Sequence, residues 1–92
     1  MYKYSPKPTG GFKRDYRKVL KQGKNRVLIE DIIEKLANGE ELPAKNKDHA
    51  LRGKWKGYRE CHIEPDWLLV YKVVKDKLIL LLVHTDSHSE LF

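Results

Sequence analysis

The sequence predicts an α+β fold in which an N-terminal helical hairpin packs on a small, twisted, mainly antiparallel sheet. Two observations lead to this fold class. The first 38 residues hold two stretches whose apolar residues recur at helical spacing, separated by a glycine. The last third holds two apolar runs rich in β-branched residues, joined by a short polar turn. With 92 residues, 40% of them hydrophobic, the chain is expected to form one small domain over residues 1–92.

Two amphipathic helices are expected, over residues 12–22 and 25–38. The apolar stripe of the first recurs at i, i+4, i+7 and i+8, and cations occupy its opposite face. The second follows Asn25, an acceptable N-cap, and stops at Gly39, which tolerates the left-handed backbone of a helix end. The link around Gly23 is short, so the two helices form a hairpin whose apolar faces need a third surface to cover.

The rest of the chain is expected to supply that surface. A short strand is expected near residues 2–5, before two prolines break the chain. Residues 42–57 show little periodicity, which indicates an extended basic loop. Strands are expected over residues 58–63, 67–74 and 78–83, the last two as an antiparallel hairpin. Their nearly continuous apolar runs are typical of strands covered on both faces, so the tail or a partner must cover the face that the helices leave open.

The charge is strongly asymmetric. The net charge is +6, and residues 1–30 alone carry nine basic and two acidic residues, a balance of +7. This distribution indicates a polyanionic partner, either nucleic acid or an acidic protein segment. The single cysteine excludes an internal disulfide, and no apolar run approaches the ~20 residues that a membrane-spanning helix needs. No secretory signal is visible at the start, so a soluble cytoplasmic protein is expected.

Four histidines lie in the second half of the chain, near cations and aromatic residues. They show no metal-ligand spacing, so no metal and no cofactor is predicted, although three histidines and Asp66 meeting around zinc stays an open, minor alternative. Between Lys45 and Trp67, cations alternate with aromatic residues, a mixture that suits single-stranded RNA. For Trp55 or Tyr58 considered alone, packing against the sheet is a better explanation of the aromatic side chain than RNA binding.

Histidines and cations together also suit metal-free cleavage of RNA. A base removes the proton of the 2′-hydroxyl, the oxygen attacks the adjacent phosphorus, and an acid protonates the departing 5′-oxygen. An imidazole can fill either role, because its unperturbed pKa of about 6.5 lies near neutrality. Charge that builds on the phosphoryl oxygens needs a nearby cation. Composition alone does not separate RNA binding from RNA cleavage.

Two segments carry a family resemblance. Residues 47–71, which include Lys-Asp-His and His-Ile-Glu-Pro-Asp-Trp, resemble the central signature of the YafQ branch of RelE-type toxins, and residues 87–92 resemble its C-terminal motif. The helical hairpin before them fits the RelE-like fold. The resemblance implies a toxin of a type II toxin–antitoxin module, a ribosome-dependent endoribonuclease that cleaves mRNA and is silenced by a cognate antitoxin. It implies partners of three kinds: antitoxin, mRNA and ribosome, with no membrane.

The resemblance also assigns roles by position. It implies catalytic roles for His49, His62, Asp66 and His88. It implies that Trp67 and Phe92 help catalysis or substrate placement. His62 and His88 are the preferred pair for proton transfer, and which is base and which is acid stays open. The cations expected to bind RNA are Lys54, Lys56, Arg59 and His84.

One position departs from the family pattern. The family commonly has Arg-Thr-Gly before the tail motif, whereas this chain has His84-Thr85-Asp86. His84 replaces a permanent cation only when it is protonated, and Arg59 and Lys56 are candidates to compensate. Two alternatives stay open: a non-catalytic RNA- or ribosome-binding module of the same fold, and a metal-dependent hydrolase. Replacement of a catalytic histidine tests the first alternative, and a chelator tests the second.

Overall fold

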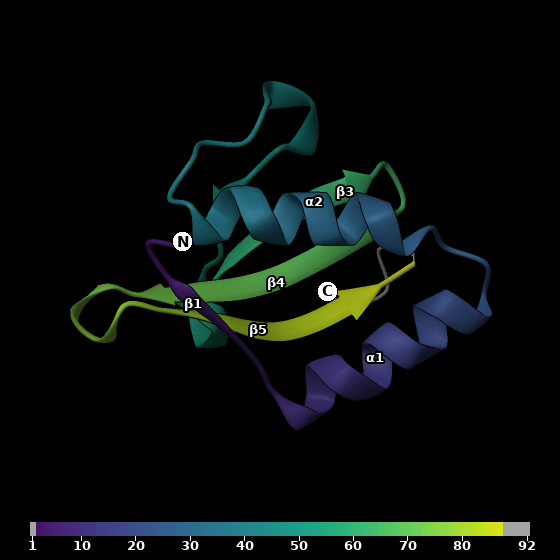
Figure 1. The fold of residues 1–92 in the computed structure, drawn as a ribbon, viewed down its shortest axis with the longest axis horizontal. Helices are drawn as coiled ribbons and strands as arrows, with labels where there is room; N and C mark the ends of the chain where they lie inside the picture. The colour runs from purple at the N-terminus through teal and green to yellow at the C-terminus, as the bar shows by residue number, and fades with distance from the viewer. Residues whose placement is uncertain (1, 88–92) are drawn as a thin grey trace.

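The computed structural model describes residues 2–87. Within this range, helices α1 (Gly10–Lys21) and α2 (Arg26–Ala37) pack on a five-stranded sheet (Figure 1). Its spatial order is β1-β5-β4-β3-β2; β1 is parallel to β5 and the other pairs are antiparallel. The predicted α+β fold is confirmed. The strands are β1 (Ser5–Pro8), β2 (His49–Ala50), β3 (Arg59–Glu64), β4 (Trp67–Val74) and β5 (Ile79–Asp86).

Side-chain caps fix where the two helices begin. The Thr9 hydroxyl accepts a hydrogen bond from the Phe12 amide at 3.2 Å, so α1 starts two residues before the expected position. Asn25 caps α2 as predicted, since its side-chain oxygen accepts from the Val27 amide at 3.0 Å. Gly39, with φ of 77°, follows the end of α2 in the left-handed region.

The N-terminal strand lies at Ser5–Pro8, three residues later than expected, and includes both prolines. The amides of Ser5 and Thr9 donate to the carbonyls of Leu78 and Leu82, at 2.8 and 3.0 Å. Alternate residues of a strand face opposite ways, so the proline nitrogens lie on the open side of this edge strand, where no donor is needed. The two prolines therefore do not break the strand, and they prevent a further strand from pairing with this edge of the sheet.

The second half follows the expected strand order with two differences. β5 runs to Asp86, three residues beyond the expected end, and so includes His84. The loop expected over residues 42–57 is interrupted by β2 and by single 3₁₀ turns at residues 44–46 and 53–55. The predicted β4–β5 hairpin is confirmed and turns through a 3₁₀ turn at residues 75–77.

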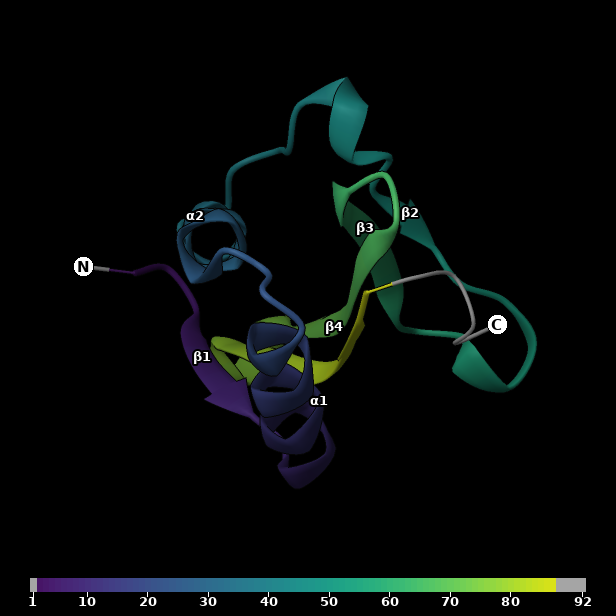
Figure 2. The same cartoon turned by 90° about the vertical axis from the view of Figure 1, so that its right-hand side faces the viewer.

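The two sheet faces are covered differently. Under the helices, one buried cluster joins both helices to the sheet and includes Cys61, Leu69 and Tyr71. On the opposite face Leu68 and Val70 are also buried, and the segment carrying Trp55 lies over this side of the sheet (Figure 2). The tail or a partner was expected to cover this second face of the sheet. The segment that carries Trp55 covers part of it instead. Each helix within residues 2–87 is too short or too polar to span a membrane.

Candidate active site

One row of side chains crosses the sheet on the face away from the helices. The register pairs His49 of β2 with Glu60 of β3, Glu60 with Val70 of β4, and Val70 with His84 of β5. Residues directly opposite one another on neighbouring strands share a face. His49, Glu60 and His84 therefore lie on one surface. At about 4.8 Å per strand, the backbones at the two ends of the row are about 14 Å apart.

His62 lies on the same face, two residues after Glu60 along β3. Its Nδ1 is 3.1 Å from the carbonyl oxygen of Pro65, and the Asn46 side-chain amide donates to the backbone carbonyl of His62 at 2.7 Å. Because a carbonyl only accepts, the contact with Pro65 places the proton on Nδ1. When the ring is neutral, the other ring nitrogen, Nε2, then carries the lone pair that can take a proton from a substrate.

His49 is held between two acceptors. Its Nδ1 lies 2.7 Å from the Lys47 carbonyl oxygen, and its Nε2 lies 3.4 Å from Oε1 of Glu60. Glu60 is only 7% exposed, and its Oε2 has no hydrogen-bond partner within residues 2–87. A buried carboxylate oxygen without a donor is costly, which is typical of functional sites. Sequence reasoning missed Glu60, although the two-residue spacing from His62 signals a shared face.

His84 is fixed by an acidic side chain from α1. Its Nδ1 lies 3.0 Å from Oδ2 of Asp15, and the same oxygen accepts from the Thr85 amide at 3.3 Å. The His84 ring packs edge-on against Trp55, with ring centroids 5.6 Å apart. Sequence reasoning missed Asp15 as well. The signal that could have found it is its position as a lone acidic residue in an otherwise cationic helix. His84 is thus a positioned imidazole, half-buried between α1 and the 3₁₀ turn at residues 53–55.

The side chains of Asp66 and Trp67 bond to residues other than the histidines. Asp66 is an exposed turn residue whose Oδ1 is 3.4 Å from Lys24 Nζ. Trp67 is fully buried, and its Nε1 donates to the Thr85 hydroxyl at 2.9 Å, which in turn donates to the Leu68 carbonyl at 2.7 Å. A ring without exposed surface cannot stack on an RNA base. The structure therefore favours a positioning role for Trp67 over the expected substrate contact.

Arg59 lies on the helix-covered face and not with the histidines. It pairs across the sheet with Tyr71, and its Nη2 is 3.1 Å from Oδ2 of Asp48. Asp48 also accepts from the Tyr71 hydroxyl, and burial raises the pKa of Tyr71. Strand alternation explains the difference from the expectation, since Glu60 next to it takes the open face. Arg59 is therefore a poor candidate to compensate for His84.

Lys54 and Lys56 flank Trp55 and are exposed, on the segment that contacts His84. His88 and Phe92, expected in the site, lie outside the described residues. Within residues 2–87, groups of three or more His, Cys, Asp or Glu side chains placed to hold a metal ion are absent. The structure thus brings His49, His62 and His84 to one face with two lysines beside it, and adds Glu60 and Asp15.

A helical hairpin on a small mixed sheet, with histidines gathered on the open face, matches the expected class of RelE-type toxins. The YafQ family, described as bacterial toxins of type II toxin–antitoxin systems, matches residues 4–92. The chain belongs to this family.

Three known proteins show how similar the relatives are. The mRNA interferase toxin YafQ of Escherichia coli K12 is 41% identical over 85 residues, covering 91% of this chain and 90% of that protein. The metal-bound toxin from Helicobacter pylori is 39% identical, with a TM-score of 0.89 and full coverage of both chains. YafQ in the E. coli DinJ–YafQ toxin–antitoxin complex is 37% identical, with a TM-score of 0.86 and 98% coverage of each chain. The family and these names class the chain as an endoribonuclease toxin.

Proposed function

We propose that this chain cleaves mRNA on the ribosome and is held inactive by a cognate antitoxin. The observation that carries the proposal is the open sheet face that His49, His62 and His84 share. The curated E. coli relative is named an mRNA interferase, which supports the substrate class. Ribosomes lie in the cytoplasm, so the toxin acts there.

The proposed reaction uses the 2′-hydroxyl of the RNA as nucleophile and needs no metal. A basic imidazole takes the hydroxyl proton, the 2′-oxygen bonds to the adjacent phosphorus, and the bond from phosphorus to the 5′-oxygen breaks. An imidazolium gives its proton to the leaving 5′-oxygen. The products are a 2′,3′-cyclic phosphate, which water opens to a 3′-phosphate, and a 5′-hydroxyl.

We assign the roles of the residues as follows, with the contacts as support. Nε2 of His62 exchanges the proton, because Nδ1 is occupied by the Pro65 carbonyl. His88 is the second member of the pair. Glu60 holds His49, and Lys54 and Lys56 attract phosphates. Asp66, which follows Pro65 in the turn after His62, adjusts or shares the proton transfer of the histidine pair.

Inducible expression with mapping of mRNA 5′ ends tests this function. Wild type is expected to arrest growth and to create new 5′ ends within reading frames. His62→Ala is expected to abolish both, whereas the matched surface variant Lys77→Ala, at an exposed turn, retains them. Cleavage at unchanged sites by a folded His62→Ala protein would refute the assigned chemistry. Growth arrest that persists without new 5′ ends would favour the non-catalytic binding module.

The antitoxin is proposed to contribute an acidic, amphipathic segment. An apolar groove of about 420 Å³ between β1 and the helices is lined by apolar residues that include Pro6, Pro8 and Ile33. Its charged lining residues are two cations and one acid, Lys13, Arg17 and Glu30. Apolar anchors beside cations fit a segment that folds on binding. The solved E. coli DinJ–YafQ complex supports a partner of this kind. Co-purification with the product of a neighbouring reading frame tests it, and growth arrest unaffected by that product would contradict it.

A further inference from the structure

A groove beside His62 plays no part in the roles assigned above. It has a volume of about 320 Å³ and is lined from α2, from the 3₁₀ turn at residues 44–46 and from the β3–β4 turn. The apolar side chains Leu28, Ile63 and Pro65 form part of its wall. Because His62 also lines it, a molecule bound in this His62 groove lies next to the imidazole that is assigned to proton exchange.

Asn46 gives the His62 groove a hydrogen-bond acceptor of fixed orientation. Its Nδ2 donates to the backbone carbonyl of His62 at 2.7 Å, and because a carbonyl only accepts, the nitrogen and the oxygen of the amide cannot exchange places. Asn46 is only 4% exposed, and its Oδ1 has no hydrogen-bond partner within residues 2–87. A buried oxygen without a donor is costly, so a ligand that supplies the donor gains more than from an ordinary hydrogen bond.

We propose that the His62 groove binds a base of the mRNA next to the cleaved phosphodiester, and that Asn46 Oδ1 accepts from the exocyclic amino group of this base. The faces of a base are apolar and its edge is polar, which matches apolar walls around an amide. Adenine, cytosine and guanine carry such an amino group. The proposal rests on the cleavage function proposed above and names a feature of the substrate that the same site selects.

The acceptor also disfavours uracil. Where cytosine has its amino group, uracil has a carbonyl oxygen, which would face Asn46 Oδ1 as a second acceptor. Such a base leaves Oδ1 without a donor and adds repulsion between the two oxygens. A site that is built to bond one polar group of a substrate rejects an analogue that lacks this group, because its own buried group is left unpaired.

Lys45 controls access to this acceptor. Its exposed side chain lines the His62 groove and also an adjoining cleft of about 80 Å³, and Asn46 lines both. The lysine stem is flexible, so it can move from one cleft to the other as a base enters. Its ammonium group then stays close to the phosphate of the same nucleotide, where a cation is favourable.

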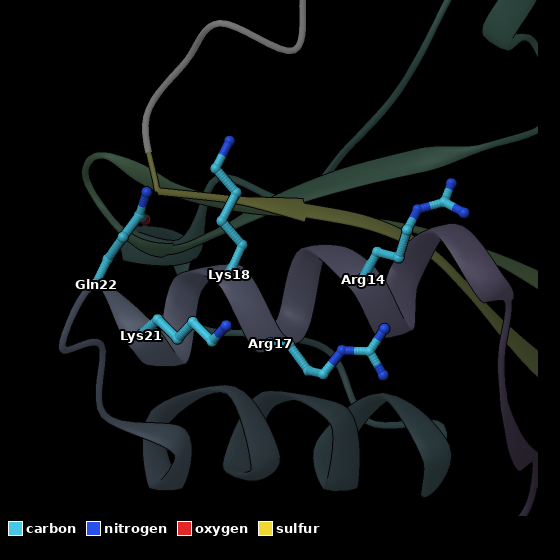
Figure 3. A pocket seen from close by; sticks show the side chains of 5 residues that line it. All are labelled: Arg14, Arg17, Lys18, Lys21 and Gln22. Atoms are coloured by element: carbon cyan, nitrogen blue, oxygen red, sulfur yellow. The ribbon is translucent and has the colours of Figure 1, made fainter.

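Two other clefts lack this combination of groups. The cleft of about 350 Å³ on α1 is lined by four cations and one glutamine (Figure 3). Among the described residues, its lining thus offers charge but no apolar wall for the face of a base. The groove between β1 and the helices has apolar walls, but its described lining includes no histidine. The His62 groove joins apolar walls, an unpaired acceptor and a candidate catalytic group.

The charge of the His62 groove favours a base over the acidic antitoxin segment proposed above. Its lining includes one acidic residue, Glu64, whose Oε1 lies 3.5 Å from Nζ of Lys24. An acidic segment would face this carboxylate and would gain Lys45 as the permanent cation of the lining. A base carries no charge, so it meets no such repulsion.

The test removes the amino group from the RNA and the acceptor from the protein. Ribosomes carry a defined mRNA in which each nucleotide that flanks the cleaved bond is, in turn, adenosine or purine riboside, which keeps the ring but lacks the amino group. Asn46→Leu removes the acceptor, and Leu28→Trp fills the groove from an exposed wall. The control is Val27→Trp, at a neighbour that is 63% exposed and does not line the groove.

The measurement is the ratio of the initial cleavage rates of the two RNAs, with circular dichroism to confirm that each variant is folded. Loss of the contact between Asn46 and the His62 backbone alone would slow both RNAs equally and leave this ratio unchanged. Wild type and Val27→Trp are expected to cleave the adenosine RNA about ten-fold faster at one flanking position. Asn46→Leu and Leu28→Trp are expected to cleave both RNAs at similar rates.

Equal rates for the two RNAs in wild type, at both flanking positions, would overturn the proposal and leave the cleavage function standing. A preference that persists in Asn46→Leu would also overturn it. If Leu28→Trp keeps the preference but binds the antitoxin more weakly, the groove belongs to the antitoxin. Wild type that cleaves neither RNA on ribosomes would refute the cleavage function and this inference with it.

Discussion

Asp15 shows how one side chain can tie a helix to a strand of the sheet. Its carboxylate accepts from the His84 ring and from the Thr85 amide, and Thr85 in turn accepts from the buried Trp67 indole. The chain thus places an imidazole, paired with a carboxylate, where the family commonly has an arginine. An arginine at position 84 could keep the contact with Asp15 and would carry charge at every working pH.

His84→Arg is therefore expected to preserve or raise the rate of mRNA cleavage at about pH 7. The guanidinium contacts phosphate without first binding a proton. The measurement is the initial cleavage rate of ribosome-bound mRNA at equal toxin concentration, with a thermal melt to show that the variant is folded. Complete loss of cleavage in a stable variant would show that the imidazole itself is required.

Cys61 gives a stability prediction at the same scale. Its side chain is fully buried, and burial raises the pKa of its thiol. A raised pKa in the folded state means that stability is full below the unfolded thiol value of about 8.5 and falls as pH rises above it. Between about pH 8 and pH 9.5, wild type is expected to lose more free energy of unfolding than Cys61→Ala. Urea unfolding at both pH values checks this, and equal losses would contradict it.

At the scale of elements, the β4–β5 pair depends on a buried hydrogen-bond chain. Trp67 donates to Thr85, and Thr85 donates to the Leu68 carbonyl. Thr85 is 2% exposed, so water cannot replace a lost partner. The isosteric change Thr85→Val leaves the indole donor unsatisfied, which costs about 1–3 kcal/mol.

Urea unfolding of Thr85→Val measures this cost. In a Trp67→Phe background the same change is expected to cost less, because the indole donor is already absent. Equal costs in both backgrounds would show that the bond from Trp67 to Thr85 does not stabilise the fold.

The elements also show what the sequence could predict. The helical stripes and the β4–β5 hairpin were predictable because period and turn chemistry are local. The N-terminal strand was misplaced because its prolines are compatible with an edge strand only once β5 is its neighbour. The face on which Arg59 lies was mispredicted for a similar reason. The pairing register of the strands decides which alternate residues face the helices, and local sequence does not show that register.

At the scale of the whole molecule, two surfaces differ in the charged groups that they present. The open sheet face holds histidines with a buried carboxylate, and the α1 face holds cations without acidic neighbours in its cleft. The sequence predicted the first through its family motifs and the second through charge asymmetry. Spacing and charge pattern hint at Glu60 and Asp15, but their contacts with His49 and His84 depend on strand pairing and on where α1 packs, which the sequence does not show.

The chemical nature of the new mRNA ends tests the central claim most directly. Purified toxin, treated with a chelator that is then removed, is added to ribosomes carrying a defined mRNA, and the downstream fragment is analysed for its 5′ end. Attack by the 2′-hydroxyl from the histidine face predicts a 5′-hydroxyl, full activity after chelation, and no product with His62→Ala. A 5′-phosphate, or activity that depends on restored metal, would contradict the account.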